Sequence, residues 1–574
     1  MQKKTLAIIG MGPRGLFALE QMVEQLQQQL DHVQIWLFET GSAWGCGPVY
    51  APSQPATNWI NIAERTLELP ERPATSCMVE VPAFPSFLAW AEQWDQKETK
   101  ADEQPDIYPP RAKIGRYLQA RFYSLVLPLV QRQAVRLFQA EVCGLEWQPD
   151  HLRLSVGGQQ HYRVDEALLT VGHQRTELDE QLERWQSATS LPTHLGVQPY
   201  PVSAFRAWDF EGNAPTGLGL RGFGLAMLDV VRAVGEWSGR FGQVVHGHMV
   251  YVRNKNQGLT IFPFSLDGLP LSAKPLNAAL DKTYAPSPRI LEALHEEVAH
   301  GASLETVGNL DFLIQPMAKI AAEIYVQHPQ RWAEDQLSET AVAALLGEWL
   351  EHDHFEHPLI LAQSRAAALA LADFMGMAKG ERWITLDYCM GQVWRHCQLT
   401  LFRALSFTKC PQGIFNQALA LHERMKRYAY GPPVLGVAQM LAMISEGILN
   451  LKYVENPQVE VVTQGWKMQK GGSEVSLKYM VNTVLDSPNI AKVATPLIKN
   501  LRSDERVTKV AGALGFQVNE NGMLTNSGTD EPLKVSVLGR LAKGTIIGVD
   551  SLVDCFGPRT TTWAKACAER LSKR

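Results

Sequence analysis

The apolar positions near the start of the chain predict a strand, a glycine turn and a helix in immediate succession. Residues 6–9 form a continuous apolar run, which is typical of a strand buried on both faces of a parallel sheet. Gly10, Gly12 and Gly15 follow in a G-x-G-x-x-G spacing, and apolar residues then recur at helical intervals. A second apolar run, VQIWLFE, ends in Glu39. The pattern therefore predicts a βαβ unit.

This unit has the spacing of a dinucleotide-binding turn. In such a turn Gly10 permits a tight bend, Gly12 lets the backbone approach a pyrophosphate, and Gly15 allows the helix to pack closely on the strand. Free N–H groups at the start of the helix attract phosphate, and Glu39 can accept hydrogen bonds from ribose hydroxyls. Because an acid disfavours a 2′-phosphate, the site is expected to bind FAD or NAD. The candidate turn residues are Gly10, Gly12, Pro13, Arg14 and Gly15, with a solvated helix start as the alternative for Arg14.

The long loop after Glu39 favours FAD over NAD. The segment GSAWGCGPVYAPSQPATNWINI is rich in glycine, proline and asparagine, and flavoproteins with two dinucleotide domains often wrap such a loop around the flavin. Trp44, Gly45 and Asn61 are therefore expected to contact FAD, and Asn58 is a weaker candidate for the substrate pocket. Capping or surface positions are the alternative for both asparagines.

A second unit of strand, glycines and helix occurs in the segment TGLGLRGFGLAMLDVVRAV. Gly222 and Gly224 take the first two glycine positions, but Met227 occupies the third, which predicts a wider spacing between helix and strand. The apolar run 248–254 is predicted to be the next strand, and its end carries Arg253 rather than an acid. An arginine suits a 2′-phosphate, which favours NADPH over NADH. A solvent-exposed arginine is the alternative.

The second half of the chain changes from helical patterns to strand patterns. From residue 276 to 447 apolar positions recur every three or four residues, which predicts a helical region inserted in the second dinucleotide unit. Arg427 in this region is either part of a solvated basic helix face or a clamp for a carboxylate or phosphate. The chain then ends in a strand, a glycine-bearing loop and a helix. This end is expected to rejoin the N-terminal sheet and to close over FAD with Gly539, Gly544 and Thr545.

Together these segments predict an α/β fold with two Rossmann-like dinucleotide-binding domains and a helical insertion. The predicted FAD domain is discontinuous and comprises residues 1–175 and 525–574. The predicted NAD(P)H domain comprises residues 196–275 and 448–524. Residues 276–447 form the helical insertion, which is expected to cap the substrate.

Composition and charge narrow the classes of function. The formal net charge of the 574 residues is -5, which provides no bulk attraction to nucleic acid. The 8 cysteines include no C-x-x-C pair and no metal-ligand spacing, so reduced thiols are expected, with no metal. No apolar run approaches the ~18 residues of a membrane span, and no signal-peptide pattern occurs. A cytoplasmic protein without membrane association is expected, and its oligomeric state stays open, with a homo-oligomer among the options.

The motifs together resemble bacterial FAD/NAD(P)-binding oxidoreductases with two dinucleotide-binding domains. The resemblance lies in IIGMGPRGL, GCGPVY, YPPRAKIGRYL and GRLAKGT. Within this group the chain is similar to the flavin-dependent N-hydroxylating monooxygenases, such as the nitrosuccinate-forming aspartate N-monooxygenases. Asp165, Leu169, Gly172 and His173 match the ends of their D-x-x-x-(L/F)-A-T-G-(Y/H) segment, whereas Thr-Val replaces its Ala-Thr centre.

A second stretch carries the same resemblance. PPRAKIGRYL is similar to the P-R-x-x-F-x-x-Y-L stretch that those enzymes place near the flavin, with Arg111 and Tyr117 aligned. The resemblance implies that Arg111, Gly172 and His173 lie at the cofactor and that Arg116 is a weaker candidate for contact with the substrate. A plain strand and turn is the alternative for Gly172 and His173.

The resemblance also implies an activity. In a flavoprotein monooxygenase of this kind NADPH reduces FAD, molecular oxygen adds to the reduced flavin, and the flavin hydroperoxide hydroxylates the nitrogen of a small amine or amino acid. The protein shields the flavin from water and holds the amine in its neutral form, so no catalytic side chain is assigned. Two alternatives stay open: an NAD(P)H-dependent flavin oxidoreductase without oxygen insertion, and a non-catalytic FAD-binding protein.

Overall fold

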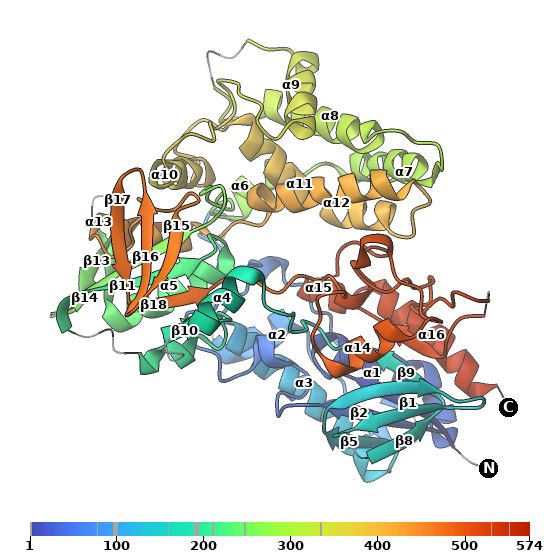
Figure 1. Cartoon of the computed structure of the whole chain (residues 1–574). Coiled ribbons are helices and arrows are strands. Elements are labelled where there is room, and N and C mark those ends of the chain that lie inside the picture. The colour runs from blue at the N-terminus through green and yellow to red at the C-terminus, as the bar shows by residue number, and fades with distance from the viewer. Residues whose placement is uncertain are drawn as a thin grey trace.

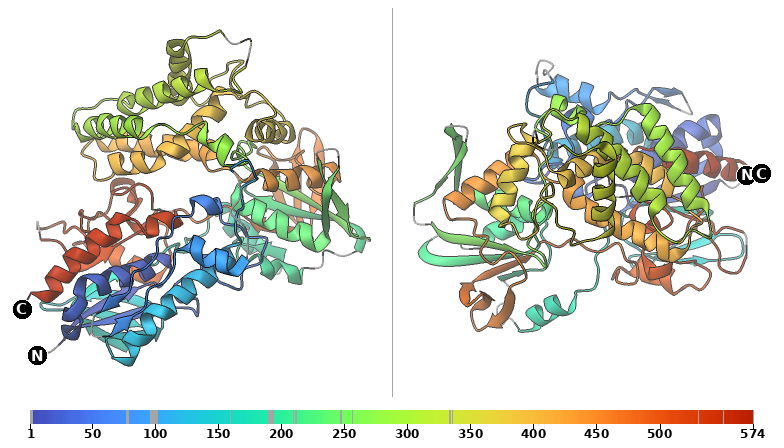
Figure 2. Two further views of the ribbon diagram at one scale, coloured as in Figure 1. Left: turned by 180° about the vertical axis from the view of Figure 1, so that it is seen from behind. Right: turned by 90° about the horizontal axis from the view of Figure 1, so that it is seen from above.

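The chain folds into two α/β parts and a helical region that lies across both (Figures 1 and 2). The computed structural model describes residues 3–76, 79–95, 102–158, 160–188, 194–208, 210, 212–245, 248–255, 257–332, 334, 336–529, 531–549 and 551–573. Both termini lie close together on the first α/β part (Figure 1). The C-terminal segment therefore returns to the part in which the chain begins.

A five-stranded sheet organises the first α/β part, in the order β19-β9-β1-β2-β5. Every neighbouring pair in it is parallel. Because β19 pairs with β9, the C-terminal end of the chain completes the N-terminal sheet, as predicted. The strands are β1 (Lys4–Ile9), β2 (Val33–Glu39), β5 (Val135–Gln139), β9 (Glu166–Leu169) and β19 (Val535–Val537).

Alternate residues of β1 enter two different cores, because successive side chains of a strand point to opposite faces. Leu6 and Ile8 belong to the core of the face covered by helices, namely α1 (Pro13–Leu26), α3 (Arg111–Gln131) and α16 (Pro558–Ser572). Ala7 and Ile9 belong to the core of the other face. That face is covered by the antiparallel sheet of β6 (Val142–Trp147), β7 (Leu152–Val156) and β8 (Gln160–Val164), together with α14 (Pro496–Ser503).

A four-stranded parallel sheet in the order β10-β18-β11-β14 organises the second α/β part. Its strands are β10 (Leu195–Gly196), β11 (Gly212–Arg221), β14 (Gln257–Phe264) and β18 (Tyr479–Asn482), and α5 (Leu225–Ser238) follows β11. An antiparallel sheet of β15 (Gln458–Val462), β16 (Gly465–Lys470) and β17 (Ser473–Leu477) shares a core with β14 and β18. A second Rossmann-like βαβ unit is therefore present, and Gly222 and Gly224 lie at its β11–α5 junction. The fold confirms the predicted α/β class.

The predicted strand 248–254 does not belong to this parallel sheet. His248–Arg253 form β13, which pairs antiparallel with β12 (Gly239–Val245) in a separate hairpin. The strand that follows α5 in the parallel sheet is β14, which pairs with β11. The predicted strand is therefore present, but an apolar run alone does not show whether a strand pairs within the main sheet or in a separate hairpin.

The helices of the helical region lie within residues 276–447. They are α6 (Ala278–Lys282), α7 (Pro288–Ser303), α8 (Asp311–Gln327), α9 (Glu339–Glu351), α10 (Ala367–Ala378), α11 (Leu386–Leu405), α12 (Gln412–Ala429) and α13 (Val434–Ser445). Ser287 and Ser338 cap α7 and α9 by accepting hydrogen bonds from backbone N–H groups of the first turn. Met440 and Met443 of α13 share one core with Val231 of α5. The helical region is thus built onto the second α/β part.

The chain returns to the first sheet earlier than the predicted boundary at residue 525. Ile490, Ile498 and Leu501 pack in the core beneath the first sheet. The Asn500 side chain accepts a hydrogen bond from the backbone N–H of Leu145 in β6, at 2.8 Å. Residues from about 490 onward therefore pack with the first α/β part. A short helix and irregular loops make these contacts, so no strand pattern marks the transition in the sequence.

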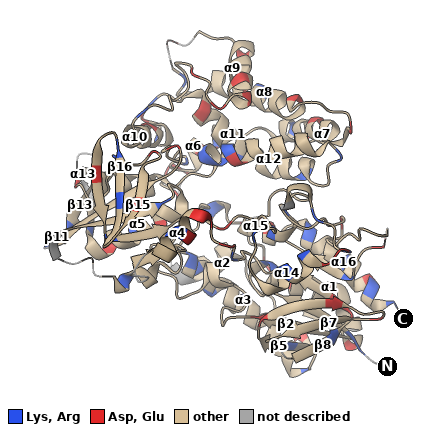
Figure 3. Cartoon of the chain, in the orientation of Figure 1, with Lys and Arg blue, Asp and Glu red and all other residues tan. Residues whose placement is uncertain are grey.

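Basic and acidic residues are interspersed along the drawn chain (Figure 3). Within the described ranges, no helix is both long and apolar enough to cross a membrane. The same residues contain no group of three side chains placed to hold a metal ion.

Candidate functional site

The first glycine turn makes backbone contacts that only glycine permits. Gly10 has a φ of +95°, and a Cβ on it would lie 2.7 Å from the carbonyl oxygen of Thr170. A Cβ on Gly15 would lie 2.2 Å from the carbonyl oxygen of Gly10, so α1 packs directly on the end of β1. Pro13 begins α1, where its missing N–H costs nothing.

The carboxylate of Glu39 lies beside this turn. It accepts hydrogen bonds from the backbone N–H groups of Met11, at 2.8 Å, and Thr40, at 2.9 Å. The first N–H groups of α1 have no partners within the helix, and a helix end of this kind is able to hold a phosphate. The turn and the acid together fit the adenosine diphosphate half of FAD.

The loop after β2 folds over the glycine turn. The N–H of Gly45 donates to the carbonyl of Met11 at 2.7 Å, and the Trp44 ring stacks on Phe122 of α3 with centroids 5.8 Å apart. A Cβ on Gly45 would lie 2.5 Å from the Cβ of Phe122. Trp44 and Gly45, predicted to contact FAD, therefore pack against α3, and neither lines the cavity described next.

A cavity of about 1350 Å³ lies beside the turn, and all three parts of the chain line it. Pockets for one small ligand usually measure about 300–1,000 Å³, so this cavity has room for more than one group. Its walls include Ser42, Ala43, Pro48 and Tyr50 from the loop after β2, Gln198 and Tyr200 from the second part, Lys274, Asp281, Arg395, Phe402 and Tyr430 from the helical region and its flank, and Ile547, Gly548, Ser551 and Asp554 from the C-terminal loop.

Three of the predicted residues line the cavity: Asn61, Arg111 and His173. The Asn61 amide donates to the carbonyl of Tyr430 at 2.8 Å. His173 lies 3.3 Å from the Arg540 guanidinium and follows Gly172, which has a φ of +66°. The turn after β9 therefore brings His173 to the wall of the cavity.

Three other candidates lie outside the cavity, which corrects the prediction that they contact the substrate. Asn58 is fully buried, and its amide donates to the Gln54 side chain at 2.7 Å. Arg116 lies on the exposed face of α3. Arg427 forms an ion pair with Asp267 after β14. A helical or loop pattern does not reveal which of its polar residues face a cavity.

The C-terminal loop approaches the turn through different residues than predicted. Gly539 makes room for Arg14, whose guanidinium donates to the Asp554 carbonyl at 3.0 Å. Arg14 thus fastens α1 to this loop. A Cβ on Gly544 would meet Val510 at 2.7 Å, and Thr545 accepts a hydrogen bond from the N–H of Phe407. Gly539, Gly544 and Thr545 therefore shape the loop, while Ile547, Gly548 and residues 551–554 supply the cavity wall.

Arg111 joins the two α/β parts at the cavity wall. Its guanidinium donates to the Asp229 carboxylate of α5 at 3.0 Å and to the Trp59 carbonyl at 3.2 Å. The Tyr200 hydroxyl donates to the same Asp229 oxygen at 2.6 Å. Asp229 is 5% exposed, so the ion pair is shielded from water. The sequence prediction placed Arg111 at the cofactor but missed this link.

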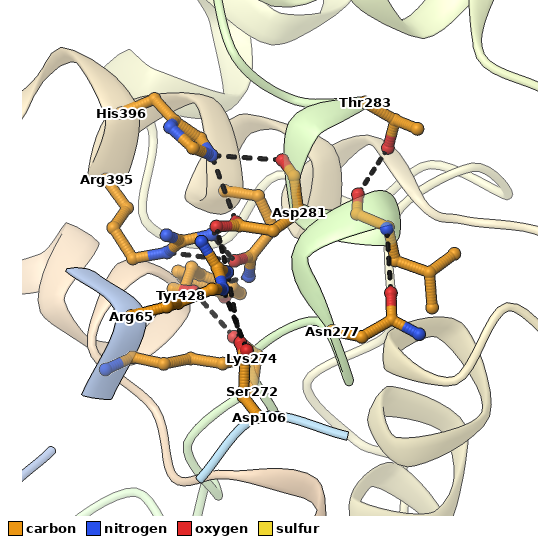
Figure 4. A network of polar contacts seen from close by, with 12 residues as sticks. Arg65, Asp106, Ser272, Lys274, Asn277, Asp281, Thr283, Arg395, His396 and Tyr428 are labelled. Carbon is orange, nitrogen blue, oxygen red and sulfur yellow. Dashed lines mark hydrogen bonds and ion pairs between the residues drawn. The ribbon is translucent and has the colours of Figure 1, made fainter. Parts of the chain in front are cut away.

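A charged network lies at one end of the cavity (Figure 4). Asp281 accepts hydrogen bonds from Arg65 at 2.7 Å, Arg395 at 2.5 Å and His396 at 3.1 Å. Arg65 also donates twice to Asp106. Burial disfavours ionisation of Asp281, but His396 and Arg395 outweigh it and hold the pKa of the carboxyl well below its usual range.

A small crevice lies at the second glycine turn. Gly224 and Leu225 at the start of α5 border a crevice of about 10 Å³, which is no more than one water molecule needs. Its other walls are apolar, including Pro270, Leu271, Leu371, Pro432 and Met440. Arg253, predicted to read a 2′-phosphate, lies on the separate hairpin and donates to the Glu446 carbonyl at 3.3 Å.

Sequence reasoning missed most of the polar wall of the cavity. Lys274, Asp281 and Arg395 come from separate segments with no common motif, and only the tertiary fold brings them together. A pair of neighbouring basic residues in α11, Arg395 and His396, was the one local signal.

Comparisons with known proteins agree with the first turn as a cofactor site. Residues 7–174 match a protein family described as FAD-NAD(P)-binding. The chain is 26% identical over 281 residues to nitrosuccinic acid synthase from Aspergillus oryzae, which covers 48% of this chain and 41% of that protein. It is 25% identical over 251 residues to a nitrosuccinate-forming L-aspartate N-monooxygenase from Streptomyces cremeus. That match covers 40% of this chain and 37% of the Streptomyces protein. These matches confirm the predicted resemblance, and the chain spans about two fifths of the length of these relatives.

Among solved structures, the reduced form of ornithine hydroxylase from Pseudomonas aeruginosa aligns with a TM-score of 0.47 and 9% identity, covering 99% of this chain and 100% of that one.

Proposed function

We propose that this protein is an FAD-dependent monooxygenase that N-hydroxylates a small amine or amino acid, with NADPH as its reductant. The observation that carries the proposal is the cavity beside the first glycine turn, which the helical region helps to enclose. A cofactor at the turn and a substrate in the cavity would be neighbours. The names of the two curated relatives, which form nitrosuccinate, support N-hydroxylation over other flavin chemistry.

FAD, when bound, supplies the redox and oxygen chemistry of the reaction. Gly10, Gly12, Gly15 and Glu39 would hold its adenosine diphosphate half, through the N–H groups at the start of α1 and the carboxylate. Asn61, Arg111 and His173 line the cavity beside it. The side chains of this protein then bind and orient the substrate and shield the cofactor from water.

The helical region excludes water from one side of the cavity. The end of α11 is fastened to the C-terminal loop, because the Ser406 hydroxyl accepts hydrogen bonds from Arg559 at 2.7 Å and from the N–H of Ile547 at 3.3 Å. The N–H of Phe407 donates to the Thr545 carbonyl at 2.9 Å. Excluding water protects reactive oxygen chemistry from wasteful side reactions.

The cationic end of the cavity favours a neutral amine. An amine nitrogen attacks as a nucleophile only without its extra proton, and nearby positive charge lowers the pKa of a bound ammonium group. Arg65, Arg395 and Lys274 provide that charge. The same cations attract the carboxylate of an amino acid.

NADPH as reductant accords with the FAD-NAD(P)-binding family of residues 7–174. No step is assigned to Gly222, Gly224 or Arg253, because none of the three lines the cavity. The test of the proposed function is the product. FAD-loaded protein is incubated with NADPH, ¹⁸O₂ and L-aspartate, then with other amino acids and diamines. An N-oxygenated product that carries ¹⁸O and scales with NADPH consumption would support the proposal. If hydrogen peroxide alone accounts for the NADPH consumed with every amine, the protein is a flavin oxidoreductase without oxygen insertion.

A further inference from the structure

Lys274 is a buried lysine at the charged end of the cavity (Figure 4). The residue is 8% exposed, and its ammonium donates to the backbone carbonyl of Asn61. The ring of Tyr108 lies 5.8 Å from its nitrogen. None of the ion pairs among the described residues includes Lys274, although buried charges are normally paired.

The carboxylates near Lys274 are engaged by other cations. Asp281 is held by Arg65, Arg395 and His396, and Asp106 is held by Arg65. Burial and the neighbouring Arg395 lower the pKa of Lys274 to about 7, while Asp281 and Asp106 partly oppose that shift. Lys274 is therefore the basic group at this end of the cavity that has no carboxylate partner among the described residues.

An unused acceptor lies next to this lysine. The side-chain oxygen of Asn61 is buried and has no hydrogen-bond partner among the described residues, whereas its amide nitrogen donates to Tyr430. Buried polar atoms without partners are rare in native proteins and call for an explanation. Here an unpaired cation and an unpaired acceptor belong to two residues in direct contact, and both residues line the cavity.

We propose that Lys274 binds an anionic group, a carboxylate or a phosphate, of a ligand in the cavity, and that the Asn61 side-chain oxygen accepts a hydrogen bond from the same ligand. The ligand thereby supplies the negative charge that Lys274 lacks among the described residues. The choice of ligands in this inference rests on the proposed function. The anion has two sources: the carboxylate of an amino acid substrate, or a phosphate of NADPH.

The test compares equilibrium binding to FAD-loaded wild-type protein and to Lys274→Met. The probes are L-aspartate, succinate, NADP⁺ and inorganic phosphate, each titrated by calorimetry. NADP⁺ carries the phosphates of NADPH but cannot reduce FAD. Lys426→Met is the matched control, because Lys426 lines the same cavity but already pairs with Glu423 at 2.8 Å. Loss of one charge-assisted hydrogen bond is expected to raise a dissociation constant about 10- to 100-fold. The control is expected to change it less than about threefold.

The pattern of loss identifies the source of the anion. Weaker binding of L-aspartate and succinate with unchanged binding of NADP⁺ assigns the site to the substrate, and the reverse assigns it to the phosphate. Unchanged binding of every probe by a folded Lys274→Met protein overturns the proposal, as does failure of wild-type protein to bind any of the four. Because binding requires no turnover, these results are independent of whether the protein hydroxylates its substrate.

Wild-type protein provides a second test that does not depend on the variant. A bound anion stabilises the protonated lysine, so binding at pH 8 is expected to take up nearly one proton, about 0.9 for a free-state pKa of about 7. The groups facing Lys274 are Arg395, His396, Asp281, Arg65, Asp106 and Tyr108. Calorimetry at pH 8 in buffers of different ionisation enthalpy measures the uptake. An uptake near zero for every anion that binds contradicts the proposal.

Discussion

Replacing Asp229 by asparagine tests the link between the two α/β parts at the cavity wall. The change keeps the size of the side chain but leaves the partly buried Arg111 guanidinium without a carboxylate at 3.0 Å. Breaking a buried ion pair by removing one partner costs about 3–5 kcal/mol. Arg111 keeps its hydrogen bond to the Trp59 carbonyl and its position 5.2 Å from the Tyr200 ring. We therefore expect a loss near 3 kcal/mol.

The loss is measured as the change in the free energy of unfolding by urea, followed by tryptophan fluorescence. Asp267→Asn is the matched control, because its ion pair with Arg427 also joins two segments but is partly exposed, and such pairs contribute less than about 1 kcal/mol. The double variant Arg111→Met/Asp229→Leu removes both charges and is expected to recover at least half of the loss. If Asp229→Asn costs no more than Asp267→Asn, the buried pair does not join the two parts.

Three further changes test other parts of the structure. Gly15→Ala is expected to weaken FAD binding about 10- to 100-fold, since overpacking costs ~1–3 kcal/mol; flavin absorbance per protein measures it, and a full flavin content would contradict the packing described. Burial lowers the pKa of His328 to about 4, and the N–H of Gln330 donates to its ring. The neutral imidazole therefore stabilises the folded protein above pH ~6.5, and this contribution is lost as the pH falls towards 4. His328 is expected to make the free energy of unfolding by urea about 2 kcal/mol lower at pH 5 than at pH 7. His328→Gln should reduce this difference, and an equal difference in both proteins would refute the prediction. Arg116→Ala is expected to leave kcat/KM within about twofold because the side chain is exposed, and a tenfold loss would return it to the substrate site.

The local sequence pattern was enough to predict the first glycine turn, because the steric requirements of that turn involve residues close together in the sequence. Gly10 and Gly15 must lack side chains where β1 meets α1, and the spacing records that need. The return of the chain to the first sheet was likewise predictable, since Val535–Val537 form a short apolar strand before a glycine. The sequence could not show that β13 is a ribbon strand, because pairing partners are set by tertiary structure.

The polar wall of the cavity was beyond local reasoning for the same reason. Asp281 becomes a shared acceptor only because Arg65 of the first part and Arg395 of α11 meet there. The apolar cover over Gly224 is also a tertiary feature. Each of these residues, read alone, has an ordinary place on a helix or loop.

Following the flavin during a single turnover shows whether this protein is a monooxygenase. FAD-loaded protein is reduced with NADPH without oxygen and then mixed with oxygenated buffer, while absorbance spectra are recorded on a stopped-flow instrument. The account predicts a long-lived, blue-shifted species between reduced and oxidised flavin, which decays faster when the substrate amine is present. A direct return to oxidised flavin, or a bound flavin that neither NADPH nor NADH reduces, would contradict the proposed monooxygenase.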